Sequence, residues 1–166
     1  KDKRTTDDRS GAVEHGEKKS TPSRNTCTLL SLIERLPLDR NHSRILEIGC
    51  GYGGALAALQ NIGFGNLFGV ESSAHRAQIA REKGGVEMFT GDFTSSELQR
   101  ALMAAGPFDL IFSSHVLEHI ADPIAFLSAA RTLQSPGGAI ILSMPNQLQE
   151  PAAAIIFFLP HLHSFT

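Results

Sequence analysis

Four closely spaced glycines, Gly49, Gly51, Gly53 and Gly54, follow a short apolar run that contains one acid, Glu47. Glycine adopts backbone angles that are closed to other residues, and it lets a ligand approach the main chain. A helix that begins after such a turn directs its free N–H groups and its positive dipole end at a ligand. The pattern therefore predicts a strand, a tight turn and a helix start that bind a nucleotide-like cofactor.

Further polar residues stand where other apolar runs end. Glu71 follows Gly51 at the interval where a dinucleotide-binding fold carries a ribose-binding acid. Asp92 closes a third apolar run, and Ser113 to His115 continue a fourth. A carboxylate accepts hydrogen bonds from hydroxyl groups, and histidine titrates near neutrality. These residues are the candidates for binding and proton transfer.

The elements that must position these residues alternate along the chain. Apolar runs predict strands at 45–48, 67–71, 86–89, 108–112 and 138–144, and helical spacing with capping residues predicts helices at 27–36, 53–60, 73–83, 95–105 and 122–133. Strands that are apolar throughout indicate a parallel sheet covered by helices on both faces. We therefore expect an α/β fold with a doubly wound parallel sheet of about five strands, whose ligands bind beyond the carboxyl ends of the strands.

Length and composition suit one globular domain. The chain has 166 residues, of which 42% are hydrophobic and 19% are charged. Residues 1–25 are polar and carry charges of both signs, so we expect a disordered tail before a domain at 26–166. The formal charge of −2 does not favour nucleic acid as a partner. A small-molecule partner is expected instead.

The cysteines and the apolar segments indicate the cellular compartment. The chain has two cysteines, Cys27 and Cys50, and one lies inside the glycine turn. We expect both to be reduced, which is typical of a cytoplasmic protein. The longest apolar run, at 151–160, is shorter than the about 20 residues that a spanning helix needs. No membrane span is expected.

Taken together, the motifs resemble the class I S-adenosylmethionine-dependent methyltransferases, and within them the small-molecule group typified by the ubiquinone-biosynthesis enzymes. The resemblance runs from about Leu29 to Thr166. It is carried by Leu46–Gly53, Gly69–Glu71, Gly91–Phe93, Phe108–Ile111 with His115–Ile120 and Asp122–Pro123, Ser135–Gly138, Met144–Asn146 and His161–Thr166. It implies a Rossmann-like fold and a methyl transfer to a small-molecule acceptor by in-line displacement.

The resemblance also implies a cofactor, S-adenosylmethionine, and a set of residues around it. Those expected at the cofactor are Glu47, Gly49, Cys50, Gly51 and Gly53 near the methionine part, Glu71 and Ser72 near the ribose, Asp92 and Phe93 near the adenine, and Ser113 and Ser114 near the sulfonium. His115 is the candidate base if the acceptor is a hydroxyl. An alternative is that His115 only lines the pocket.

Three alternatives stay open. The glycine spacing also fits a nicotinamide-dependent oxidoreductase. His115 to His119 spell H-x-x-E-H, a zinc-hydrolase pattern, with His161 or His163 as a third ligand, although no metal is expected. The third alternative is a non-catalytic or fragmentary cofactor-binding domain. The resemblance implies two further strands that this chain does not reach, so we expect a C-terminal truncation.

A sheet that ends at its fifth strand has an edge with unpaired backbone groups. We expect the apolar segment 152–159, a second copy or another partner to cover this edge. The acceptor and the methylated atom are not identified by these motifs, because acceptor pockets are built from variable loops.

Overall fold

Five strands and five α-helices alternate along residues 24–145, which are the residues that the computed structural model describes. The chain order is α1 (Arg24–Ile33), β1 (Arg44–Ile48), α2 (Gly54–Asn61), β2 (Asn66–Glu71), α3 (Ala74–Gly84), β3 (Glu87–Thr90), α4 (Ser96–Ala105), β4 (Phe108–Ser114), a single 3-10 turn η1 (Leu117–His119), α5 (Pro123–Leu133) and β5 (Gln134–Ser143). This alternation confirms the α/β prediction.

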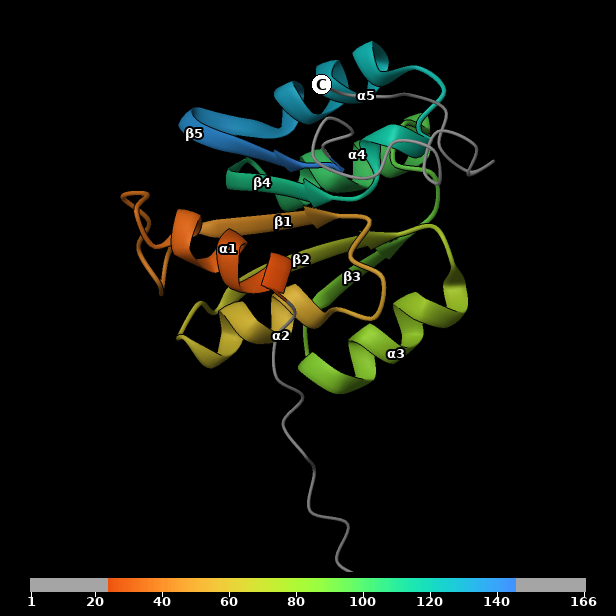
Figure 1. Cartoon of the computed structure of the whole chain (residues 1–166). Helices are drawn as coiled ribbons and strands as arrows, with labels where there is room; N and C mark the ends of the chain where they lie inside the picture. The colour runs from red at the N-terminus through yellow and green to blue at the C-terminus, as the bar shows by residue number, and fades with distance from the viewer. Residues whose placement is uncertain (1–23, 146–166) are drawn as a thin grey trace, which may run out of the picture.

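The strands form one parallel sheet in the order β3-β2-β1-β4-β5. Figure 1 shows α1, α2 and α3 on one face of this sheet and α4 and α5 on the other. The sheet is therefore doubly wound, as predicted. Strand β1 lies at the centre of the sheet, with β2 and β3 added on one side of it and β4 and β5 on the other. Folds of this kind bind ligands at the carboxyl ends of the strands, near the point where the strand order changes direction. Here the carboxyl ends of β1, β2 and β4 lie at that point.

A separate apolar core fills each side of the sheet. One core joins Ile33 of α1 and Leu59 of α2 to Ile45 of β1. The other joins Leu102 of α4 and Phe126 of α5 to the opposite face of the sheet. Side chains of β1 alternate between the faces, so the face of Ile45 also receives Glu47.

Two elements, α1 and β5, differ from the predicted ranges by three residues or more at one end or both, whereas the others agree to within two residues. Helix α1 starts earlier than predicted and ends at Ile33, after which the chain makes i→i+3 turns such as Leu36 N to Ile33 O, at 3.0 Å. Pro37 disfavours helical backbone angles at Leu36, so the chain cannot continue as a helix beyond these turns. Strand β5 starts at Gln134, which pairs with Phe108 of β4. The next pair is Leu110 with Ala139, so the register of the two strands shifts between these pairs.

Several expectations lie outside the described residues. They concern the disordered tail up to residue 23, the apolar segment 152–159 and the closing segment at 161–166. Within 24–145, no helix is long and apolar enough to cross a membrane.

Candidate active site

The glycine turn after β1 has the predicted backbone geometry. Gly49, Gly51 and Gly53 have φ angles of 77°, 56° and 74°, which residues with a Cβ rarely adopt. A Cβ on Gly49 would lie 2.3 Å from Cγ2 of Val116, whereas a Cβ on Gly51 would meet nothing within 4 Å. The packing of Val116 thus leaves no room for a side chain at position 49. Gly51, in contrast, borders open space that a ligand can enter.

Glu71 joins the end of β2 to this turn. Its Oε2 accepts a hydrogen bond from Gly51 N at 3.0 Å, and its Oε1 accepts one from Ser73 N at 2.8 Å. A guanidinium nitrogen of Arg76 lies 3.0 Å from Oε1. The carboxylate is only 4% exposed. Because Oε1 is engaged by the start of α3, Oε2 is the oxygen with a lone pair left for a ligand hydroxyl.

Glu47 lies under the turn on the face covered by α2. Burial raises the pKa of its carboxyl to about 8, although a hydrogen bond from the backbone of Leu56 opposes this rise. Its Oε2 has no hydrogen-bond partner among the described residues. Glu47 is therefore buried beneath the turn and does not line the cavity described below.

Cys50 directs its side chain away from the turn. Its Sγ lies 3.9 Å from Sδ of Met88, inside the core under α1, α2 and α3. Burial raises the pKa of the thiol to about 12, and the negative charges of Glu47 and Glu71 add to the rise. The backbone N–H of Cys50 donates to Val70 O at 3.0 Å and its carbonyl accepts from Gly53 N at 2.9 Å, so the second lone pair of this carbonyl is the part that can meet a ligand.

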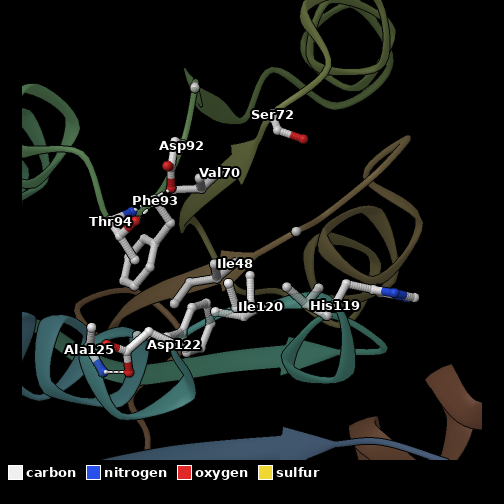
Figure 2. A pocket seen from close by; sticks show the side chains of 15 residues that line it. Ile48, Val70, Ser72, Asp92, Phe93, Thr94, His119, Ile120, Asp122 and Ala125 are labelled. Carbon is white, nitrogen blue, oxygen red and sulfur yellow. Dashed lines mark hydrogen bonds between the residues drawn. The ribbon is translucent and has the colours of Figure 1, made fainter. Parts of the chain in front are cut away.

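A cavity of about 440 Å³ opens beside the turn, at the carboxyl ends of β1, β2 and β3. Four of the predicted cofactor residues line it, namely Gly49, Ser72, Asp92 and Phe93. Figure 2 shows Asp92, Phe93 and Thr94 on one side of the cavity and Asp122 and Ala125 on the opposite side. Its size falls in the range of small-molecule sites.

The walls of this cavity suit a flat heterocycle with hydrogen-bond donors. Phe93 and Phe126 supply aromatic surface, with ring centroids 5.0 Å apart. Asp92 stands at the rim, where its Oδ1 accepts hydrogen bonds from the backbone N and the hydroxyl of Thr94, at 2.9 and 2.8 Å. Its Oδ2 can accept from a ligand. The aromatic walls and the carboxylate acceptor therefore fit an adenosine-like group.

The sequence motifs missed the wall formed by α5 and the segment before it. Ile120, Ala121, Asp122, Ala125 and Phe126 line the cavity. Asp122 caps α5, since its Oδ1 accepts from Ala125 N at 2.9 Å. The Asp122–Pro123 pair predicted where this helix starts. It did not predict that the helix lies beside Phe93, because that contact joins residues far apart in the sequence.

The predicted residues at the carboxyl end of β4 do not line the cavity. Ser113 is buried, and its hydroxyl donates to Ile48 O at 3.0 Å, which ties β4 to β1. Neither Ser113 nor Ser114 lines the cavity. His115 is half-exposed and does not line the cavity either; its ring contacts Asn25 of α1 and Glu118 of η1.

A doubly wound sheet with a glycine turn after β1, an acid at the end of β2, an acid after β3 and a cavity beside the turn is the arrangement expected of a class I S-adenosylmethionine-dependent methyltransferase. The methyltransferase domain family matches residues 23–162, and the chain belongs to this family. Membership of the class makes S-adenosylmethionine the cofactor of the domain.

Individual relatives agree with this assignment. A ubiquinone biosynthesis O-methyltransferase of Cereibacter sphaeroides is 29% identical over 143 residues, which cover 80% of this chain and 58% of that protein. The protein of the same name from Dinoroseobacter shibae is 33% identical over 107 residues, or 63% of this chain and 42% of that protein. The chain thus spans 58% of the length of the first relative.

Solved structures show the same fold. One is an amino pentose methyltransferase from Micromonospora echinaspora with S-adenosylmethionine bound, which has a TM-score of 0.61 at 20% sequence identity. The match covers 76% of this chain and 52% of that protein. A methyltransferase of Haloferax volcanii in complex with an activator protein has a TM-score of 0.56 at 25% identity, covering 68% of this chain and 49% of its own.

The family assignment removes the basis for the oxidoreductase alternative. The zinc alternative gains no support from residues 24–145, which contain no group of three or more His, Cys, Asp or Glu side chains that could hold a metal ion. His115 also precedes η1, so it does not share a helix with His119. His161 and His163 lie outside the described residues.

Proposed function

We propose that this chain is the catalytic domain of a methyltransferase that methylates a hydroxyl oxygen of a small molecule. The observation that carries the proposal is the cavity in which Gly49, Asp92 and Phe93 meet at the carboxyl ends of the strands. The names of the matched relatives, which are ubiquinone biosynthesis O-methyltransferases, support oxygen as the acceptor atom and a small molecule as the acceptor.

In this proposal the predicted residues other than Glu47 each have a part. Asp92 and Phe93 hold the adenine, and Ser72 and Oε2 of Glu71 hold the ribose. The glycine turn and the backbone of Cys50 hold the methionine part. When bound, S-adenosylmethionine supplies an electrophilic methyl group on a positively charged sulfur. The protein has to bind it, exclude water and orient the acceptor.

His115 is the proposed base for the acceptor hydroxyl. Its ring is half-exposed and lies at the carboxyl end of β4, beside the segment that packs on Gly49. Ser113 and Ser114 are proposed to contribute backbone groups near the sulfonium, since the hydroxyl of Ser113 is engaged with Ile48. A cytoplasmic location and a partner at the edge of β5 stay predictions.

Calorimetric titration of the purified chain with S-adenosylmethionine, and in parallel with NADH, tests the cofactor. We expect micromolar affinity for S-adenosylmethionine and no heat from NADH. Glu71→Gln and Asp92→Asn each weaken a charge-assisted hydrogen bond, so the affinity should fall by about tenfold or more. Glu82→Gln, an exposed change on α3, is the control and should bind like the wild type.

Two outcomes contradict the proposal. Binding of NADH with no binding of S-adenosylmethionine would restore the oxidoreductase alternative. A folded chain that binds neither compound would favour the non-catalytic alternative. If S-adenosylmethionine binds, incubation with its methyl-labelled form and catechol as a probe acceptor, followed by mass spectrometry, tests transfer to oxygen.

A further inference from the structure

Glu118 is a buried carboxylate that the cofactor site does not explain. It is 1% exposed, and neither of its oxygens has a hydrogen-bond partner among the described residues. An isolated buried carboxylate is costly, so it needs a structural or chemical reason. Its nearest described polar contact is Nδ1 of His115, which lies 3.5 Å from Oε1. The carboxylate is thus directed at the imidazole of the proposed base.

The other ring nitrogen of His115 contacts a residue far away in the sequence. Nδ2 of Asn25, at the start of α1, lies 2.9 Å from Nε2. An amide nitrogen only donates hydrogen bonds, so Nε2 must accept and carries no proton in this arrangement. The proton of the neutral ring is then on Nδ1, where it faces Glu118.

The backbone of His115 holds the ring in this position. Among the described residues, His115 is the only non-glycine residue with a positive φ angle, at 56°. Its N–H donates to Ser143 O of β5 at 2.8 Å. A non-glycine residue in this region is strained, and such strain is concentrated at functional positions. His115 is thus held by Asn25 of α1, Ser143 of β5 and Glu118 of η1.

We propose that Glu118 is a positioning residue that holds His115 as a general base with Nε2 free to accept a proton. This inference rests on the proposed transfer to a hydroxyl. Nε2 takes the proton of the acceptor O–H, and the electron pair of that bond stays on the oxygen, which becomes the nucleophile. The imidazolium that forms faces the Glu118 carboxylate, and its proton is later lost to water.

Asn25 occupies the place of the acceptor in this arrangement. Its amide donates to Nε2 as the acceptor hydroxyl would, so the acceptor has to displace it. The distance of 3.5 Å between His115 and Glu118 is longer than a good hydrogen bond. Such bonds are often long in a free enzyme and shorten when the substrate binds.

Nitrogen NMR of histidine-labelled protein, without cofactor or acceptor, tests the arrangement. The spectrum is recorded at a pH where the ring is neutral, and His115 is assigned from the signal that disappears in His115→Gln. We expect the wild type to have the Nδ1–H tautomer. Because Asn25 also favours this tautomer, the effect of Glu118 is measured in an Asn25→Ala background, where Glu118→Met removes the carboxylate facing Nδ1 and should shift the ring toward the Nε2–H tautomer. Glu118→Gln keeps an acceptor oxygen and should retain the wild-type tautomer.

The controls separate positioning from folding and from cofactor binding. Glu82→Gln should leave the tautomer unchanged. Glu118→Met removes a buried charge without changing the length of the side chain much, so the variant should fold. It should also bind S-adenosylmethionine with wild-type affinity in calorimetry, because Glu118 does not line the cavity.

Two results overturn the inference. One is a wild-type His115 with its proton on Nε2, which can be observed even if no Glu118 variant folds. The other is an Asn25→Ala, Glu118→Met double variant that folds and keeps the Nδ1–H tautomer. Failure of cofactor binding is a different result, because it contradicts the proposed function while the tautomer can still be as expected.

Discussion

At the scale of single residues, the site contains three buried carboxylates with different surroundings. Glu71 is satisfied by backbone N–H groups and Arg76, whereas within residues 24–145 the one ion-pair contact of Glu118 is to His115, at 3.5 Å. Glu47 has one backbone hydrogen bond and one orphaned oxygen. Residue type alone predicted an acid near the ligand for Glu47 and Glu71, but their different chemistry follows from burial and from the partners available.

The raised pKa of Glu47 predicts a stability that depends on pH. Its pKa is about 8 in the folded chain against an ordinary value of 4.5, so the folded state binds the proton more tightly than the unfolded state. Stability is therefore greatest below the unfolded value and falls as pH rises from about 4.5 to 8, by an amount of the order of a few kcal/mol. Urea unfolding at a series of pH values measures this slope.

Glu47→Gln is the matched variant, because glutamine keeps an oxygen for the N–H of Leu56 and does not titrate. The loss of stability between pH 5 and pH 8 should be smaller in this variant than in the wild type. Equal slopes in the two proteins would mean that Glu47 is not protonated in the folded state.

At the scale of elements, the strand ends and the segments that cross them build the site. The 3-10 turn η1 places Val116 on the glycine turn and Glu118 beside His115. Helix α5 closes the cavity from the side opposite β3. The glycine turn is consequently held between its own strand and a segment that follows β4.

Two glycines of the turn should respond differently to the same substitution. Gly49→Ala combines left-handed strain with a clash against Val116, so it should cost about 3 kcal/mol or more. Gly51→Ala has the strain without the clash and should cost about 1–2 kcal/mol, while weakening cofactor binding because its Cβ enters the open space. Urea unfolding and calorimetry measure the two effects.

A second-site change checks the cause. In a Val116→Ala background, Gly49→Ala should be less costly than in the wild type, because Cγ2 of Val116 is the atom nearest to the new Cβ. Additive effects of the two substitutions would show that the clash is not what requires Gly49.

At the scale of the whole molecule, the sheet joins two cores into one body. Leu59 in the core under α1, α2 and α3 and Leu102 in the core under α4 and α5 are both fully buried. Both cores pack on the same strands. Loss of either core exposes a face of the sheet on which the other depends.

Leu59→Ala and Leu102→Ala should each cost about 2–5 kcal/mol and should preserve a single unfolding transition. Met103→Ala, which changes a side chain that is 54% exposed on the same helix as Leu102, should stay within about 0.5 kcal/mol of the wild type. Circular dichroism during urea unfolding measures all three. Two separated transitions in either core variant would mean that the two sides unfold independently.

The sequence by itself determined the alternation of strands and helices, the glycine turn and the acids at the strand ends. These features depend on neighbouring residues, since apolar periodicity, caps and left-handed glycines act over a few positions. The helix caps at Ser73, Ser95 and Asp122 were also readable in this way.

Only the tertiary structure decided which of these residues meet. The side chain of Cys50 enters the core, Ser113 ties two strands together, and Val116 covers Gly49. Asn25 reaches His115 across 90 positions of sequence. Such contacts depend on how helices pack on a sheet after several crossovers, and no local pattern encodes that packing. The proposed pairing of His115 with Glu118 is likewise a property of the folded chain.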